Sequence, residues 1–284
     1  MVASIEPVMM MTYVKRYPLL LFFSLAYILP WLVWGTSIAA ARGWLTFHIP
    51  QPLAFWLGLT VATYLTAALT GGWPAIKELL SRLVRWQVSS GWYLLALTLT
   101  GLLSLAAIGL YLALGGQHQM GLLLSLSDIW PALLFQSFFF WLTEETAWRG
   151  FALPRLQTRF SAVTASLILG LLWGGWHLPL VFIPGSFQAT IPFTGFVLSA
   201  MATSVLLTWL FNHSHGSVLI TALFHAATDV AIAYTGVMSG DIWLFWLFIA
   251  SQWLMAGVVI MLEGPAHLVR TGDVNAAQYR ALGV

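Results

Sequence analysis

Residues 133–150, LLFQSFFFWLTEETAWRG, join an almost wholly apolar run to three charged side chains. Only 7% of the 284 residues are charged and 60% are hydrophobic, whereas a soluble domain is roughly half apolar and about a quarter charged. The mean hydropathy is +0.87. This composition predicts an all-α polytopic membrane protein.

Apolar runs long enough to cross a bilayer recur along the whole chain. A transmembrane helix needs about 20 mostly apolar residues. Eight segments meet this requirement: 17–40, 53–71, 92–114, 129–149, 162–184, 192–211, 218–236 and 242–262. We predict a single integral membrane domain over residues 1–284, with a core at about 129–236. The first run is too long for a signal-peptide core and no cleavage site follows it, so we expect a retained span.

Basic residues orient these spans by the positive-inside rule. With both termini in the cytoplasm, ten of the 11 Lys and Arg residues fall on the cytoplasmic side and only Arg42 falls on the other. The ten are Lys15, Arg16, Lys77, Arg82, Arg85, Arg149, Arg155, Arg159, Arg270 and Arg280. We therefore predict that both termini are cytoplasmic.

Residues 73–88, WPAIKELLSRLVRWQV, differ from the spans. Apolar residues recur at helical spacing with charged residues mostly between them. This pattern predicts one amphipathic helix on the cytoplasmic membrane surface, as an anchor or as a gate for substrate.

Absent features narrow the function. The chain has no cysteine, which excludes disulfides, thiol nucleophiles and Cys-ligated zinc. It has no basic tract, so nucleic acid is not an expected partner. The expected surroundings are the lipid bilayer, and no oligomeric state is indicated.

Ionisable groups within spans are costly and therefore mark functional sites. Glu145 and Arg149 are four residues apart with the glutamate first, the favourable order for an ion pair on one helix face. Glu144 points about 100° away from Glu145. The arginine can thus hold one glutamate and leave the other for a different neighbour.

Two further spans carry polar side chains. His225 and Asp229 are four residues apart on one face, and His177 follows a glycine pair that permits close helix approach. A polar group that lies within the bilayer needs a hydrogen-bond partner in the protein. We therefore expect these groups to converge with the glutamates at one site.

The depth of this site follows from spacing. Glu145 and His177 each lie 16 residues from Ser161, so a straight helical hairpin would place both about 24 Å from its turn. His225 lies only about 10 Å into its span. These depths agree if the hairpin projects into the cytoplasm, which predicts a site about 10 Å inside the cytoplasmic face.

Two carboxylates and two histidines suit the activation of water. One group takes the proton, and a donor or cation stabilises the developing oxyanion. The same set could instead bind zinc with an open position for water, the candidate ligands being Glu145, His177, His225 and Asp229. The H-E-x-x-H and G-x-S-x-G motifs are absent, which disfavours zincin and serine-hydrolase sites.

These residues resemble a known family. EETAWR (144–149) matches the E-E-x-x-x-R motif of the CAAX prenyl endopeptidases, also called type II CAAX proteases or CPBP/Abi intramembrane proteases. WGGWH (173–177) and HAATD (225–229) resemble its F-x-x-x-H and H-x-x-x-N motifs. The resemblance implies a membrane endopeptidase that hydrolyses a peptide or lipidated protein near the cytoplasmic face.

The resemblance also implies roles. Glu144 with His177 would activate water, while Glu145 and Arg149 would support and orient the groups of the site. His225, with the residue at 229, would stabilise the oxyanion. A metal-dependent version of the family places Glu and His on zinc.

Two positions depart from the family pattern. Trp173 replaces the usual Phe, for which we expect an adjustment of packing. Asp229 replaces the usual Asn, whose amide could donate to an oxyanion that an ionised carboxylate would repel. Asp229 must then be protonated, ligate a metal or orient His225.

Two other functional classes fit an intramembrane charge cluster. One is a non-proteolytic scaffold, or a peptide-maturation or immunity factor with a degenerate site, which could dispense with Glu144, His177 and His225. The other is a transporter that uses carboxylates in a proton relay. A transporter would more often show paired broken helices in two halves, and no such repeat is present.

Overall fold

The computed structural model describes residues 14–121 and 123–269, and these residues form helices without any strand. This confirms the all-α prediction. The helices in chain order are α2 (Pro18–Ala41), η1 (Ala54–Thr60), α3 (Val61–Leu83), α4 (Ser90–Ala113), η2 (Leu126–Asp128), α5 (Ile129–Leu142), η3 (Thr146–Ala152), α6 (Leu153–Gln157), α7 (Ala162–Trp176), η4 (Leu178–Phe182), η5 (Phe187–Ala189), α8 (Phe193–His213), α9 (Val218–Thr235) and α10 (Ile242–Glu263).

Seven helical segments in the described part of the chain are long and apolar enough to cross a membrane. They correspond to seven of the eight predicted spans. The remaining predicted span, 129–149, is the one that carries the two glutamates, and it is divided into shorter helices. The chain is thus an integral, multi-pass membrane protein. Arg270 and Arg280 lie outside the described residues.

The division of this span begins at Thr143, whose backbone angles are φ −117° and ψ −90°. Its hydroxyl donates to the Phe139 carbonyl at 2.7 Å, and the Thr146 hydroxyl donates to the Trp141 carbonyl at 2.5 Å. Such bonds to the preceding turn compete with the regular helical pattern. The π-helix η3 follows at once, so Glu144 and Glu145 stand at a junction between helices.

The predicted amphipathic helix is the last part of α3. Gly72 breaks the helix with φ 61° and ψ −155°, a left-handed conformation that glycine adopts at little cost. The segment that follows turns away from the preceding span and ends at Leu83. Its position on a membrane surface stays a prediction.

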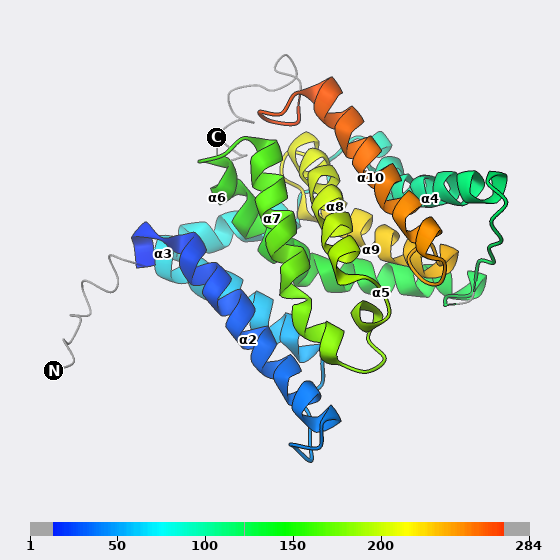
Figure 1. Cartoon of the computed structure of the whole chain (residues 1–284). Coiled ribbons are helices and arrows are strands. Elements are labelled where there is room, and N and C mark those ends of the chain that lie inside the picture. Colours follow the sequence, from blue (N-terminus) through cyan, green and yellow to red (C-terminus); the bar gives the residue numbers. More distant parts are fainter. Residues whose placement is uncertain (1–13, 122, 270–284) are drawn as a thin grey trace.

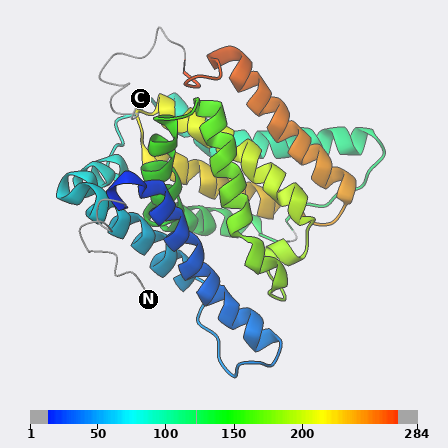
Figure 2. The same ribbon diagram turned by 60° about the vertical axis from the view of Figure 1, so that its left-hand side comes forward.

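Helices α7 and α8 pack closely as an antiparallel pair (Figures 1 and 2). A Cβ added at Gly170 would lie 2.6 Å from the Cα of Met201, and one added at Gly174 would lie 3.1 Å from the Cα of Val197. Two glycines four residues apart therefore let the two backbones approach. Figure 1 also shows α4, α5 and α9 running across this pair.

The hairpin that contains α6 and α7 is held to its neighbours at its turn. At its turn, Gln157 and Asn212 exchange side-chain hydrogen bonds of 2.9 and 3.3 Å, and the Ala162 N–H donates to the Ala266 carbonyl at 2.7 Å. Asn212 is near the end of α8, and Ala266 follows α10. The turn thus contacts the ends of both helices. Its projection into the cytoplasm stays a prediction.

Candidate active site

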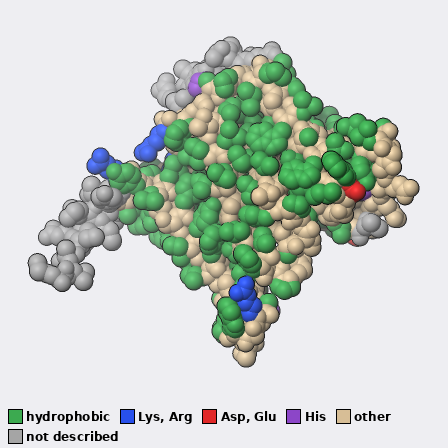
Figure 3. Space-filling model, in the orientation of Figure 1, with side chains coloured by type: hydrophobic (Ala, Val, Ile, Leu, Met, Phe, Trp, Pro, Cys, Tyr) green, Lys and Arg blue, Asp and Glu red, His purple; other side chains and the backbone are tan. Residues whose placement is uncertain are grey.

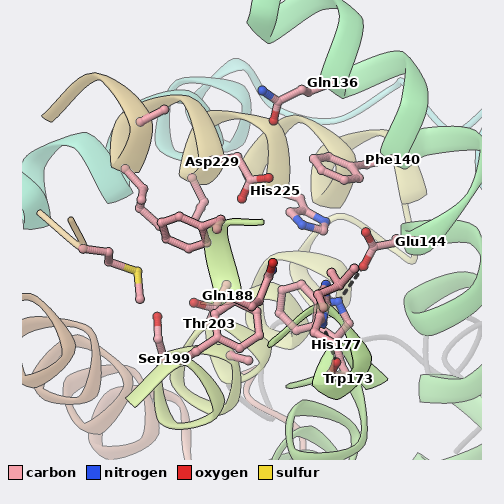
Figure 4. A pocket seen from close by; sticks show the side chains of 18 of the residues that line it. Gln136, Phe140, Glu144, Trp173, His177, Gln188, Ser199, Thr203, His225 and Asp229 are labelled. Carbon is pink, nitrogen blue, oxygen red and sulfur yellow. Dashed lines mark hydrogen bonds between the residues drawn. The ribbon is translucent and has the colours of Figure 1, made fainter. Parts of the chain in front are cut away.

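A cavity of about 390 Å³ lies between α5, α7, α8 and α9. Four of the six predicted site residues line it, and Figure 4 shows their side chains around the same space: Glu144, His177, His225 and Asp229. They come from the junction after α5, the end of α7 and the middle of α9. The structure therefore brings together side chains that are up to 85 residues apart in the sequence.

Glu145 and Arg149 lie behind the cavity wall, and both side chains are fully buried. Arg149 Nη1 donates to Glu145 Oε1 at 2.9 Å. The same oxygen lies 2.8 Å from His225 Nδ1. One carboxylate oxygen thus joins the arginine of η3 to the histidine of α9, and this fixes which ring nitrogen of His225 remains for the cavity.

Glu144 is held by two tryptophans. Its Oε2 accepts from Trp173 Nε1 at 2.5 Å and from Trp148 Nε1 at 3.3 Å. The side chain is buried but still borders the cavity. Trp173 therefore does more than adjust the packing, since a phenylalanine at this position would have no N–H to donate.

Aromatic rings fix the two histidines. The His225 ring stacks on Phe140 with centroids 3.7 Å apart and planes only 2° from parallel. His177 Nδ1 lies 2.9 Å from the Trp173 carbonyl oxygen, and its ring packs edge-on against Phe196. Each imidazole is thereby oriented by one polar contact and at least one ring contact.

Asp229 lies one turn after His225 and is partly exposed to the cavity. No hydrogen bond holds its carboxylate among residues 14–121 and 123–269. Gln136 also lines the cavity, and its Oε1 is buried without a hydrogen-bond partner in that same part of the chain. The sequence analysis did not single out Gln136. The sequence could have revealed it through the four-residue spacing of Gln136, Phe140 and Glu144. This spacing places the Gln136 amide on the same helix face as the glutamate.

The donor set does not fit the zinc site that the sequence allowed. Within the described residues, no group of three or more His, Asp or Glu side chains is arranged to hold a metal ion. Glu145 Oε1 is already shared by Arg149 and His225, and His177 Nδ1 faces a carbonyl oxygen. We therefore derive no step through a metal.

Comparison with known proteins finds a family that is similar to the part of the chain that carries this site. Residues 125–231 match the model of the type II CAAX prenyl endopeptidases, Rce1-like. The match covers less than half of the chain, and we call residues 125–231 the Rce1-like segment. It contains all six predicted site residues, which confirms the resemblance based on the three motifs.

One relative of the Rce1-like segment is the protein named CAAX prenyl protease 2 from Methanococcus maripaludis. The two chains are 35% identical over 89 residues, which is 29% of this chain. The match spans 32% of the relative's own length, so about a third of that protein is represented in the similarity.

Proposed function

We propose that this protein is an intramembrane endopeptidase in which Glu144 activates the water that attacks the peptide bond. The observation that carries the proposal is the meeting of Glu144, His177 and His225 at one cavity within a membrane-spanning bundle. The Rce1-like segment supports the reaction class, since the relative's name is that of a protease.

Glu144 is suited to act as the general base. Trp173 and Trp148 occupy Oε2 and leave Oε1 for a water molecule in the cavity. As that water attacks the carbonyl carbon, its proton passes to the carboxylate. When the C–N bond breaks, the same proton passes to the leaving amine. His177, on the facing wall, orients the water.

His225 is suited to stabilise the oxyanion. Its Nδ1 is bound to Glu145, so Nε2 is the nitrogen left for substrate. Once the ring carries a second proton, Nε2–H donates to the oxyanion and the Glu145 carboxylate balances the charge. Arg149 keeps that carboxylate in place. Preorganised donors of this kind supply a large share of enzymatic rate enhancement.

Asp229 lies where it can face the same oxyanion. A carboxyl group donates a hydrogen bond only while it is protonated. We propose that the protonated form of Asp229 assists His225, in the position where an Asn amide is usual in the family.

The substrate we propose is a peptide or protein segment with an apolar or lipid group near the scissile bond. Most of the cavity lining is apolar, including Phe55, Leu180, Phe187, Phe196, Ile232 and Met238. An apolar wall beside a polar end accommodates a greasy group next to a peptide bond. The name of the relative, a CAAX prenyl protease, points to the same class.

A test compares wild type with Glu144→Ala in purified form and in cells. Wild type should cleave a prenylated peptide that ends in a CAAX sequence, and the variant should not. If no peptide is cleaved and Glu144→Ala replaces the wild type in cells, a scaffold or maturation factor is the better account. A chelator arm with zinc add-back tests the zinc alternative, in which chelation abolishes cleavage.

A further inference from the structure

A second group of polar side chains borders the cavity, apart from the proposed catalytic groups. Ser199 and Thr203 of α8 both line the cavity and are only 5% and 3% exposed. They lie four residues apart on one helix face, the face that also carries Phe196. Figure 4 shows them across the cavity from Asp229. The proposed hydrolytic mechanism gives these two hydroxyls no role.

Gln252 of α10 holds both hydroxyls from behind the cavity wall. Ser199 Oγ donates to Gln252 Oε1 at 2.7 Å, and Gln252 Nε2 donates to Thr203 Oγ1 at 3.1 Å. Gln252 is buried and does not line the cavity. A polar group in a membrane helix needs partners within the protein, and these two hydroxyls supply them. The three side chains therefore form one network that links α10 to the cavity.

The outer surface of α10 is apolar. Figure 3 shows hydrophobic side chains over most of the face on which α10 lies in Figure 1. The exposed side chains of this helix are Ile242, Trp243, Trp246, Ala250, Leu254, Met261 and Leu262. Gln252 is thus a polar side chain that points inward from a helix with an apolar exposed surface. Polar groups placed inside a membrane bundle commonly mark a functional site.

The network leaves one hydrogen-bonding function of each hydroxyl for the cavity. Because Ser199 donates to the amide, its oxygen can still accept. Because Thr203 accepts from the amide, its O–H can still donate, and no hydrogen bond among residues 14–121 and 123–269 uses that hydrogen. Thr208, which is farther along α8, instead donates to the Ser204 carbonyl at 2.9 Å, a common bond of helical threonines. An acceptor and a donor therefore stand side by side on the cavity wall.

The spacing of the two hydroxyls matches an extended peptide. Positions four residues apart on a helix are separated by about 6 Å along its axis. Alternate residues of an extended chain point the same way and are about 6.6 Å apart. Each peptide unit offers one N–H and one C=O. A peptide that lies along α8 can therefore place an N–H at Ser199 and a C=O at Thr203.

The same face of α8 leads to the proposed catalytic groups. Phe196 packs edge-on against His177, with ring centroids 5.1 Å apart. Ser199 and Thr203 follow Phe196 by three and seven residues, which is about 4.5 and 10 Å along the helix. An extended chain covers these distances in about one to three residues. The two hydroxyls are therefore within reach of a peptide whose scissile bond lies at His177.

We propose that Ser199 and Thr203 form a subsite that binds the backbone of an extended substrate segment, about one to three residues from the scissile bond. Ser199 Oγ accepts from a peptide N–H, and the Thr203 hydroxyl donates to a peptide C=O. Gln252 is a positioning residue, because it acts through the two hydroxyls. Backbone groups are the same in every sequence, so this subsite selects an extended conformation. The inference rests on the proposed function.

Ester substitution in the peptide tests the Ser199 contact directly. Each backbone amide within three residues of the scissile bond of a prenylated peptide is replaced in turn by an ester, which removes one N–H. Binding of each peptide is measured by fluorescence anisotropy with Glu144→Gln, in which cleavage should be slow. At one position the ester should weaken binding about 2- to 10-fold, the range of one hydrogen bond.

Addition of Ser199→Ala to Glu144→Gln should reduce the effect of that ester to less than about twofold, since the contact is then already lost. Equal effects of the ester with and without Ser199→Ala, at every position, overturn the proposal.

Two further variants separate a peptide subsite from a contact between helices. Thr203→Val and Gln252→Leu should each raise KM about 2- to 10-fold and leave kcat nearly unchanged. Thr208→Val is the matched control, because it makes the same substitution on α8 at a position that does not line the cavity. Its KM should equal that of wild type. An equal rise of KM in Thr208→Val and Thr203→Val overturns the proposal.

The binding measurement does not depend on hydrolysis. If wild type cleaves no peptide and the ester effect still depends on Ser199, the subsite stands and the proposed endopeptidase function fails. If wild type cleaves the peptide and no ester effect depends on Ser199, the subsite fails and the proposed function stands.

Discussion

Trp173 Nε1 donates a 2.5 Å hydrogen bond to Oε2 of Glu144, the carboxylate that borders the cavity. The same indole ring lies edge-on to His225, with centroids 5.1 Å apart, and its centroid is 4.8 Å from the guanidinium carbon of Arg149. One side chain therefore contacts the proposed base, the proposed oxyanion donor and the buried cation. We assign Trp173 the role of a positioning residue.

Replacing Trp173 by Phe should lower kcat and leave KM nearly unchanged. A hydrogen bond to a charged acceptor is worth about 1.5–3 kcal/mol, which corresponds to roughly 10- to 100-fold in rate. The ring contacts would be largely kept, so folding should be affected less than catalysis. Steady-state cleavage of a prenylated peptide gives both constants.

Trp148→Phe is the matched control, because Trp148 donates to the same oxygen over the longer distance of 3.3 Å. Its effect on kcat should be smaller. A larger loss of kcat in Trp148→Phe than in Trp173→Phe would contradict the positioning role of Trp173.

Removing the buried cation should destabilise the fold. Glu145 and Arg149 are both fully buried, so Arg149→Met leaves the carboxylate without its permanent cation and with only the His225 contact. Breaking a buried ion pair costs about 3–5 kcal/mol. Thermal unfolding in detergent should show a lower Tm for Arg149→Met, and Glu145→Gln in the same chain should recover part of the loss.

The comparison for this pair is Glu78→Gln. Glu78 and Arg82 form another pair four residues apart, but the Glu78 side chain is 57% exposed. An exposed ion pair contributes about 0–1 kcal/mol, so the Tm of Glu78→Gln should barely differ from that of wild type. Equal losses at both pairs would refute the buried network.

Asp229→Asn should keep activity near the wild-type level at neutral pH and preserve it at higher pH. An amide donates to an oxyanion at every pH, and one such donor is worth about 10²–10³ in kcat. Wild-type activity should fall as rising pH ionises Asp229, and the variant should not show that fall. A variant slower than wild type at every pH would mean that the carboxylate itself is needed, to orient His225 or to ligate a metal.

Gly170→Ala should destabilise the α7–α8 pair. The added Cβ would lie 2.6 Å from the Met201 Cα and 2.9 Å from the Ser204 Cβ, and such overpacking costs about 1–3 kcal/mol. Gly101→Ala is the control, because no atom lies within 4 Å of its added Cβ. Tm should fall only for Gly170→Ala; an equal response of both variants would show that close approach is not the cause.

Much of the site follows from the sequence because its signals are local. The four-residue spacing of Glu145 and Arg149 predicts their ion pair, and the cost of polar groups in lipid predicts that separate spans converge. The helix break was not predicted, since Thr143 and Thr146 act through hydroxyl bonds that resemble ordinary helix positions in sequence. The bond from Trp173 depends on the packing of α7 against η3.

The depth of the site was the least predictable feature. Counting residues from Ser161 predicts that Glu145 and His177 lie level, and the structure brings the neighbouring Glu144 to the same cavity as His177. The count did not reveal that the 158–161 turn is level with the ends of α8 and α10, because that level is set by the contacts of Gln157 and Ala162 with distant segments. The projection of the hairpin into the cytoplasm stays a prediction.

The central claim is that Glu144 activates water for peptide hydrolysis. The most direct measurement is cleavage of a prenylated CAAX peptide in H₂¹⁸O by purified wild type and Glu144→Gln, followed by mass spectrometry. We predict one ¹⁸O atom in the new carboxyl terminus with wild type, and a rate at least about 100-fold lower with the variant, as expected for loss of general-base catalysis. Glu144→Gln that cleaves as fast as wild type would contradict the account.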